Sequence, residues 1–272
     1  FFPAAASDGT PIQSAMAVVD TNNGAVLAMI GGRDYTVRRG LNRATQMRRQ
    51  PGSALKPLAV YGPALELGYT TASVLLDEKT SFGGYTPRNA GDRYYGLVTM
   101  RTAIRNSLNT TAVRLLEEIG LDASIQYLNK MGIPTRNSDR NLSLALGSMT
   151  YGVTPVELAA AYVPYANGGI YHQPYCVERI ETVDGSNVYE RKDSGKQVLS
   201  AQNAFLMTSL LQSVVSSGTG TRMLAANTPI AGKTGTVSMT GGNRDIWMTA
   251  YTPEISVAVW MGYDQTDAKH KI

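Results

Sequence analysis

The chain has 272 residues, of which 43% are apolar and 17% charged, a composition typical of a globular protein long enough to bury a full core. Its net charge is only +4, and the basic stretch from Arg38 to Arg49 lacks the interleaved aromatic residues and the helix-turn-helix pattern that favour a nucleic-acid partner. No apolar run approaches the ~18 residues of a membrane-spanning helix, so we expect the chain itself to be soluble, without membrane contact.

Two strands and a helix are expected in the N-terminal part. The segment 15–32, AMAVVDTNNGAVLAMIGG, contains two apolar runs joined across Asn23-Gly24, which is the strongest short-range signal for a hairpin. After Gly52 the apolar residues take helical spacing, so we expect Ser53 to open a buried helix. Pro63 lies deeper in that helix, where a proline can produce a kink.

The middle of the chain is expected to be mainly helical. Residues 75–97 are rich in Gly, Tyr and Asp and predict a long ordered loop. Residues 98–120 predict two helices separated by Ser107-Leu108-Asn109, because Ser and Asn compete for backbone hydrogen bonds and favour helix ends. Over 154–169, Thr154 and Glu157 form the pattern of a capping box at the start of another helix.

Strand patterns return in the C-terminal part. Asp184-Gly185 predicts a second hairpin, and the single cysteine, Cys176, excludes an internal disulfide and is expected to be a buried strand residue. A capped helix is expected over 200–218. The segment 247–263 is then expected to fold back on itself as a last pair of strands.

Strands therefore stand at both ends of the chain, with helices between them. This order favours an α/β fold of the α+β kind, in which one antiparallel sheet is built from both chain ends, is flanked by helices and carries an inserted helical lobe. We expect a single domain, 1–272, with a sheet lobe of about 1–45 plus 170–272 and a helical lobe of about 50–168.

The first chemical motif is the pair Ser53 and Lys56 in QPGSALKP. Residues at i and i+3 share one face of a helix, so the Lys56 amine can lie beside the Ser53 hydroxyl. A serine needs a base to become a nucleophile, and a lysine can be that base only if burial or a second cation lowers its pKa. By itself the motif is also explained by a helix cap.

A second lysine is available in PIAGKTGTVSM. Lys233 lies there in a predicted strand, followed by Thr234 and Thr236, whose hydroxyls suit a carboxylate. Gly235 lacks a side chain, so a peptide ligand could approach this strand closely and pair with it. A simple surface turn would explain the same residues.

The third motif is Ser107-Leu108-Asn109, where Ser107 can relay a proton and Asn109 can hold a substrate amide. An ordinary helix cap also fits this pattern. The joint occurrence of the three motifs in this order, about 50 and then about 125 residues apart, is far less expected by chance than any one of them.

With these motifs in that order, the chain resembles the penicillin-interacting serine acyltransferases, whose signatures include S-x-x-K and K-T-G. Within that superfamily it resembles the transpeptidase domain of a class A penicillin-binding protein. The resemblance covers nearly the whole chain, including LNRATQMRRQPGSALKPLAVYGPALELGYT, VTMRTAIRNSLNTTAVRL and IAGKTGTVSMTGGNRDIWMTAYTPEISVAVWMGYD. It implies a β-lactamase/transpeptidase-like fold.

The resemblance also implies roles for the motif residues. Ser53 would be the acylated nucleophile, Lys56 its proton acceptor, and Ser107 and Asn109 would line the same cleft. Lys233 would supply a positive field, and Thr234, Gly235 and Thr236 would bind the substrate. The backbone N–H groups of Ser53 and Thr236 would form the oxyanion hole, and no metal or cofactor would be needed.

The implied reaction is D,D-transpeptidation of peptidoglycan stem peptides that end in D-Ala-D-Ala, with D,D-carboxypeptidase activity as a side reaction. β-Lactam antibiotics would acylate the same serine. The implied location is the extracytoplasmic face of the bacterial cell membrane, with a glycosyltransferase domain and a membrane anchor upstream in the full-length protein.

Two alternatives share the motifs. A β-lactamase would need a base that activates water, and no Glu of an E-x-x-L-N element lies between Ser107 and Lys233. A β-lactam sensor domain is disfavoured by the class A sequence blocks that precede Ser53.

Two further alternatives belong to other classes of protein. A phosphate loop ending in Gly-Lys-Thr would need glycine where Asn227 stands. A Ser-His-Asp hydrolase would have to use His172 or His270, and no serine lies in G-x-S-x-G.

Overall fold

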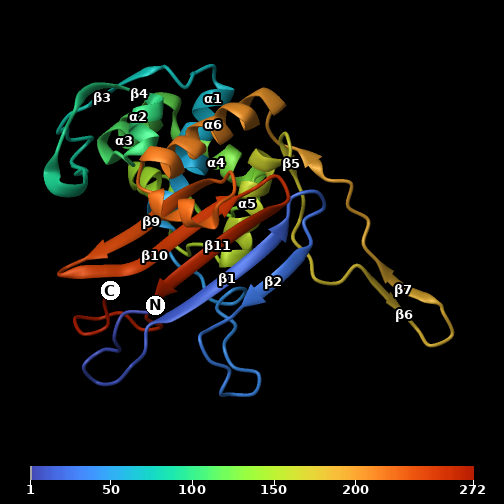
Figure 1. The fold of residues 1–272 in the computed structure, drawn as a ribbon. Coiled ribbons are helices and arrows are strands. Elements are labelled where there is room, and N and C mark those ends of the chain that lie inside the picture. Colours follow the sequence, from blue (N-terminus) through green and yellow to red (C-terminus); the bar gives the residue numbers. More distant parts are fainter. Residues whose placement is uncertain (1) are drawn as a thin grey trace.

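The computed structural model describes residues 2–272, and its centre is a five-stranded antiparallel sheet in the order β2-β1-β11-β10-β9. The sheet joins both ends of the chain, as expected from the strand pattern (Figure 1). Its strands are β1 Gln13–Asp20, β2 Val26–Ile30, β9 Ala231–Met239, β10 Gly242–Tyr251 and β11 Ile255–Gly262. β9 is an edge strand, so one of its sides pairs with no other strand of the sheet.

The predicted hairpins at both chain ends are confirmed. β1 pairs with β2 across the Asn23-Gly24 turn, and β10 pairs with β11 across the turn that contains Pro253. In β1, Ala15, Ala17 and Val19 are buried while their neighbours are not, because alternate side chains of a strand point to opposite faces. One face of the sheet therefore packs against the helices.

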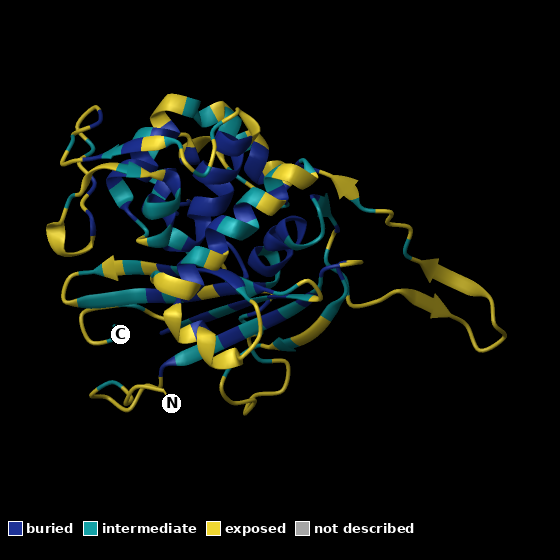
Figure 2. Cartoon of the chain, turned by 45° about the horizontal axis from the view of Figure 1, so that its top comes forward, coloured by how far each residue is buried: buried dark blue, intermediate teal, exposed yellow. Residues whose placement is uncertain are grey.

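Two helices lie on that face of the sheet, α5 Pro155–Ala166 and α6 Ala201–Ser217. The other helices pack farther from the sheet, against α6, one another and the helical turns that follow Gly52. They are α1 Gly62–Glu66, α2 Met100–Arg105, α3 Asn109–Ile119 and α4 Leu121–Lys130. α5 lies on the sheet, where Ser256 of β11 donates to the Ala159 carbonyl at 2.7 Å. Figure 2 shows the buried residues concentrated between these helices and the sheet. In the described part of the chain, no helix combines the length and the apolar character needed to cross a bilayer.

The two predicted helix starts are also confirmed. Thr154 and Glu157 form the capping box that begins α5, and Ser200 caps α6. α5 is apolar on all sides because it is enclosed by the sheet and by α6. Glu157 is occupied by this cap and by Arg48.

The helix expected after Gly52 is present but irregular. Gly52–Leu55 forms a 3₁₀ turn and Pro57–Tyr61 a π-helical turn before α1 begins. Pro57 has no N–H, so the Ser53 carbonyl cannot receive the bond of an α-helix and accepts one from Lys56 instead. The expected irregularity at Pro63 therefore lies earlier, and Pro63 itself stands in the first turn of α1, where proline is tolerated.

The segment 75–97 was expected to be a loop, and this is only partly right. Its ends form β3 Val74–Asp77 and β4 Gly96–Thr99, which pair as an antiparallel ribbon beside α3 (Figure 1). This part of the chain carries two buried polar side chains, Asp77 at the end of β3 and Asn89 in the connection between the strands. The alternation of the short strands is too brief to stand out from the surrounding polar residues.

Hairpin β6 Arg179–Glu181 and β7 Asn187–Glu190 projects from the body of the molecule, and all its residues are exposed (Figure 2). The prediction that Cys176 is buried in a strand is therefore wrong. Cys176 is exposed and lies in the bend that leads to this hairpin, outside any strand. The hairpin projects into solvent, so its apolar residues do not pack against the core. The sequence pattern alone does not show whether a strand is buried or projects.

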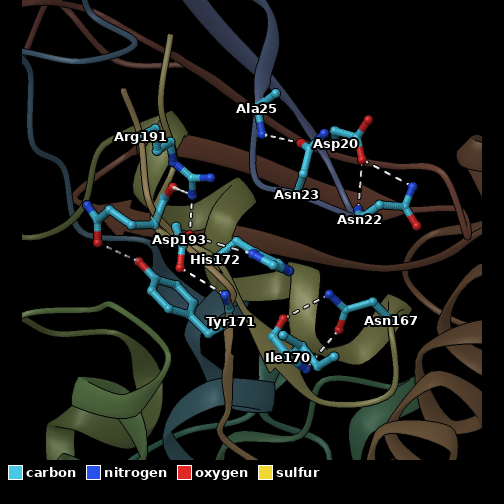
Figure 3. Close-up of polar contacts among 12 residues, drawn as sticks. Asp20, Asn22, Asn23, Ala25, Asn167, Ile170, Tyr171, His172, Arg191 and Asp193 are labelled. Carbon is cyan, nitrogen blue, oxygen red and sulfur yellow. Dashed lines mark hydrogen bonds and ion pairs between the residues drawn. The ribbon is translucent and has the colours of Figure 1, made fainter. Parts of the chain in front are cut away.

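The base of the hairpin is held by polar contacts (Figure 3). His172 lies 3.6 Å from an Asp193 oxygen, and Arg191 pairs with the same carboxylate. Short strands β5 Ile170–Tyr171 and β8 Lys196–Gln197 pair next to it. Asn167 joins this base to the β1–β2 turn by donating to the Thr21 carbonyl at 2.7 Å.

Candidate active site

A cleft of about 1180 Å³ opens along the free edge of β9. Its walls come from the Gly52–Leu55 turn, the segment 88–90, the loop between α2 and α3, the chain that follows α6, and residues of β1, β10 and β11. The cleft is lined by six of the eight residues selected from the sequence: Ser53, Ser107, Asn109, Thr234, Gly235 and Thr236. The other two, Lys56 and Lys233, are fully buried beneath it. Three segments that are distant in the sequence thus meet at one place.

Ser53 is the second residue of the 3₁₀ turn and is half-buried. Its hydroxyl forms no hydrogen bond with any residue of the described chain and faces the cleft. The side chains at i and i+3 of a 3₁₀ turn are eclipsed, so Lys56 follows Ser53 on the same side. This places an unpaired hydroxyl at the surface of the cleft and an amine below it.

Close contact between the turn and β9 depends on two glycines. Gly52 has a φ of +56°, and a side chain there would place its Cβ 2.5 Å from the Thr236 carbonyl oxygen. A Cβ on Gly235 would lie 2.3 Å from the Pro51 carbonyl oxygen. The backbones of Ser53 and Thr236 are therefore adjacent.

The expected reason for glycine at 235 needs correction. The sequence suggested that its missing side chain leaves room for a peptide ligand. In the structure that room is filled by Pro51 and Ala54, which the added Cβ would meet at 2.3 and 3.0 Å. Gly235 thus permits the turn to rest on the strand, and the ligand has access to the cleft along the edge of β9.

The Lys56 amine holds the loop that contains the second serine. It donates to the carbonyls of Ser107 and Leu108 at 2.7 and 2.9 Å, and to Asn109 Oδ1 at 2.6 Å. No hydrogen bond joins it to Ser53. To accept a proton from Ser53, the amine must release at least one of these three contacts, because a neutral amine has only two N–H donors.

Ser107 connects the two buried lysines. Its Oγ lies 2.8 Å from Lys233 Nζ and 3.4 Å from Lys56 Nζ. The backbone at Ser107 has a φ of +56°, an uncommon value for a residue with a side chain. A residue other than glycine is retained in this strained position, and its hydroxyl bridges two amines.

The surroundings of the two amines favour their neutral forms. Burial lowers the pKa of Lys56 well below its ordinary value, Lys233 lowers it further, and the Asp77 carboxylate opposes both effects. Burial lowers the pKa of Lys233 to about 7. At neutral pH the site can therefore hold an amine with a free lone pair, which is the form that accepts a proton.

Asn109 is the first residue of α3, and both ends of its amide are engaged. Its Oδ1 accepts from Lys56 and its Nδ2 donates to the Arg88 carbonyl at 2.7 Å, which fixes the orientation of the amide. One N–H of Nδ2 remains for a ligand in the cleft.

Thr219 was not among the residues selected from the sequence. Its hydroxyl lies 2.8 Å from the Thr234 hydroxyl, and it lines the cleft together with Arg222. The Gly-Thr-Gly sequence that follows α6 could have indicated a hydroxyl in a close backbone approach. From the sequence, only Gly218 was interpreted, as the end of the helix. Thr236, the other hydroxyl on β9, is exposed to the cleft.

The approach to Ser53 is held from β10. Trp247 Nε1 donates to the Gln50 carbonyl at 2.9 Å, and Arg244 donates to the Gln50 side chain at 2.8 Å. Asp245 is fully buried and accepts from Trp260 Nε1 at 2.9 Å.

Neither His172 nor His270 lines the cleft. The described residues contain no cluster of His, Cys, Asp and Glu able to hold a metal ion.

A family model described as "Penicillin binding protein transpeptidase domain" matches residues 14–271. The chain belongs to this family. The match spans the sheet, the helices and all eight candidate residues, so the β-lactamase-like fold inferred from the sequence is confirmed.

Individual penicillin-binding proteins are similar over nearly the whole chain. Penicillin-binding protein 1F of Bacillus subtilis is 46% identical over 256 residues, which is 93% of this chain and 35% of that protein. The structure of the penicillin-binding protein PonA1 from Mycobacterium tuberculosis is 28% identical with a TM-score of 0.84, over 95% of this chain and 71% of that one. PonA1 in complex with penicillin V is 27% identical with a TM-score of 0.81, over 96% of this chain and 73% of that one.

The chain spans only a part of its curated relatives. It covers 35%, 40% and 32% of three of them, two from Bacillus subtilis and one, a penicillin-binding protein 1A, from Clostridium botulinum. Those relatives are thus more than twice as long as the transpeptidase region.

Proposed function

We propose that this transpeptidase domain cross-links peptidoglycan stem peptides through an acyl-enzyme on Ser53 and that β-lactams acylate the same residue. The observation that carries the proposal is that an unpaired Ser53 hydroxyl lines the same cleft as Ser107, whose hydroxyl joins two buried amines. This arrangement provides a nucleophile, a base with a lowered pKa and a proton carrier in one cleft.

In the acylation step, Ser53 Oγ gives its proton to the neutral Lys56 amine and attacks the carbonyl carbon of the penultimate D-Ala. The C–N bond to the last D-Ala breaks, and the leaving amine takes a proton delivered through Ser107. In the second step the amine of a neighbouring stem peptide attacks the ester, gives up a proton to the same groups and restores the Ser53 hydroxyl. Protons balance over the two steps.

The backbone N–H groups of Ser53 and Thr236 would stabilise the oxyanion of both tetrahedral intermediates. Their proximity follows from the contact of Gly52 with Thr236. Two fixed donors of this kind contribute about 3 kcal/mol or more to the stability of the transition state. Thr234 and Thr236 would bind the carboxylate of the terminal D-Ala, with Thr219 holding the Thr234 hydroxyl.

The structure offers little support for the β-lactamase alternative. Rapid hydrolysis needs a carboxylate that activates water beside the ester. Glu157 is occupied at the start of α5, and none of the residues that line the cleft is Asp or Glu. A slowly hydrolysed acyl-enzyme, which waits for an amine, fits this cleft better.

For the whole protein, we propose a place on the extracytoplasmic face of the bacterial membrane, with an anchor and a glycosyltransferase domain outside the present chain. The greater length of the curated relatives supports this proposal.

Mass spectrometry after exposure to penicillin tests the function. The expected result is one covalent adduct on the peptide that contains Ser53, and none in Ser53→Ala. A Ser81→Ala variant, which changes an exposed serine outside the cleft, should react like the unchanged chain. Attachment at another residue would refute the role of Ser53, and rapid repeated turnover of the β-lactam would favour the β-lactamase.

A further inference from the structure

A buried carboxylate lies behind the cleft, at the end of β3. Asp77 is fully buried, and its Oδ1 accepts from Asn89 Nδ2 at 2.7 Å and from the Thr110 hydroxyl. Its Oδ2 accepts from the Tyr95 backbone N–H at 3.0 Å. Burying a charged carboxylate costs free energy unless it is paired or fully hydrogen-bonded. We therefore asked which function the buried Asp77 carboxylate serves.

Asn89 passes this contact on to the start of α3. Its Oδ1 accepts from the backbone N–H groups of Asn109 at 2.7 Å and Thr110 at 3.3 Å. Leu108, the residue before α3, provides no side-chain cap. The N-terminus of α3 is therefore capped by Asn89, which lies 20 residues before Asn109 in the sequence. A helix is more often capped by the residue that directly precedes it.

These contacts end at the amine proposed as the base. The backbone of Asn109 is held by Asn89, and its Oδ1 lies 2.6 Å from Lys56 Nζ. We infer that Asp77 and Asn89 are positioning residues, which fix the start of α3 so that Asn109 and the Ser107 loop aim the Lys56 amine at Ser53. This inference rests on the proposed function, because it assigns Lys56 the task of accepting a proton.

The orientation of Asn89 depends on the charge of Asp77. The Asn89 amide must turn its oxygen to α3 and its nitrogen to Asp77, and a carboxylate is a pure acceptor that enforces this choice. Asp77→Asn brings a second amide to the contact. If the introduced amide turns its oxygen to Asn89 Nδ2, its NH2 group meets the Tyr95 backbone N–H, and two donors face each other. If it turns the other way, its NH2 group meets Asn89 Nδ2, unless Asn89 also turns and α3 loses its cap.

Asp77 also acts on Lys56 through its charge. The charged groups that affect the pKa of Lys56 are Lys233 on β9, which lowers it, and Asp77 on β3, which raises it. The residues of the α2–α3 loop that contact the amine, Ser107 and Asn109, are uncharged. Loss of the Asp77 charge should therefore lower the pKa of Lys56 further and extend its neutral form to lower pH.

The test measures the rate of acylation by a fluorescent penicillin as a function of pH. Asp77→Asn is expected to slow acylation at neutral pH by roughly 10- to 100-fold, because a small displacement of a reacting group has effects of this size. It is also expected to shift the acid limb of the profile to lower pH. A residue that only supports the fold would change the rate without moving this limb.

An exchange of the two side chains separates positioning from general damage. Asn89→Asp alone brings two carboxylates together and should also slow acylation. In Asp77→Asn combined with Asn89→Asp, the introduced amide donates to the introduced carboxylate, which still accepts from the N–H groups of α3. The double variant should recover part of the rate, because the Arg93 carbonyl, which now accepts from Asn89 Nδ2 at 2.9 Å, would face a carboxylate oxygen and lose its donor.

The matched control is Asp122→Asn, an exposed aspartate on α4 that should leave both rate and profile unchanged. Melting temperatures identify any variant that does not fold. An Asp77→Asn variant that folds and reacts within twofold of the original chain, with an unmoved acid limb, would overturn the inference. So would a double variant no faster than the single variants. If the unchanged chain does not react with penicillin, the proposed function itself fails, which is a different outcome.

Discussion

Lys233 Nζ lies 2.8 Å from Ser107 Oγ, and the same hydroxyl lies 3.4 Å from Lys56 Nζ. Two fully buried lysines that are far apart in the sequence therefore share one serine in the lining of the cleft. Two adjacent ammonium groups would repel each other here, so at least one amine is neutral at physiological pH. The predictions below follow from this arrangement and from the backbone contacts around it.

Lys56→Met is expected to reduce the rate of acylation by ~10²–10⁴-fold, because it removes the base and retains the length of the side chain. The structure indicates that Lys56→Ala also lowers the melting temperature, since it opens a cavity and leaves the Ser107 and Leu108 carbonyls without donors. Lys130→Met, at an exposed position on α4, is the control. Unchanged acylation in Lys56→Met would show that another group accepts the proton.

Ser107→Gly is expected to change stability and activity in opposite directions. At a φ of +56°, glycine relieves strain, so the melting temperature should stay the same or rise. Loss of the hydroxyl removes the bridge between the amines, and the rate of acylation should fall by about 10-fold or more. Ser107→Ala should show the lower rate without the gain in stability. The role of the bridge is refuted if both variants react at the original rate.

The stability of the domain should increase with pH above neutrality. Lys233 has a pKa of about 7 in the folded state against an ordinary value of 10.5, so between these values the unfolded chain binds the additional proton. The free energy of unfolding then rises with pH, and Lys56 acts in the same direction. Above about pH 10 the buried tyrosines Tyr162 and Tyr165, whose pKa values are raised by burial, reverse the trend, because only the unfolded chain loses their protons.

Urea unfolding at pH 8 and pH 9 checks this dependence. Lys233→Met should reduce the slope by about 1.4 kcal/mol per pH unit, which is the contribution of one proton. Lys130→Met removes an exposed lysine and should keep the original slope. An equal slope in all three chains would mean that Lys233 keeps its proton in the folded state.

Gly235→Ala should disrupt the contact between β9 and the nucleophile turn. The added Cβ would lie 2.3 Å from the Pro51 carbonyl, and overpacking of this kind costs about 1–3 kcal/mol. The acylation rate should fall as well, because the backbone N–H groups of Ser53 and Thr236 move apart. Gly32→Ala is a suitable control, since its Cβ would meet the ends of two side chains, Arg43 at 2.6 Å and Gln13 at 3.5 Å, and no backbone atom. Melting temperatures and acylation rates that match those of this control would contradict the tight contact.

The sequence by itself determined the local elements and the identity of the motif residues. The Asn23-Gly24 turn, the Thr154–Glu157 capping box and the helix break at Ser107 are set by the preferences of neighbouring residues, and the structure contains each of them. The order of strands and helices was also enough to predict the fold. Strands at the two chain ends can pair their backbone N–H and C=O groups with each other in one sheet. The roles of the motif residues came from a family resemblance.

Only the tertiary structure decided how these residues contact one another. Lys56 is bound to the Ser107 loop, and Gly235 makes room for Pro51. Asp77 contacts α3 directly at Thr110 and also through Asn89. None of these contacts joins neighbours in the sequence. Cys176 and the segment 75–97 were misjudged for the same reason. Burial and long-range hydrogen bonds depend on which segments come into contact when the sheet and helices pack. The spacing of residues along the chain does not predict those contacts.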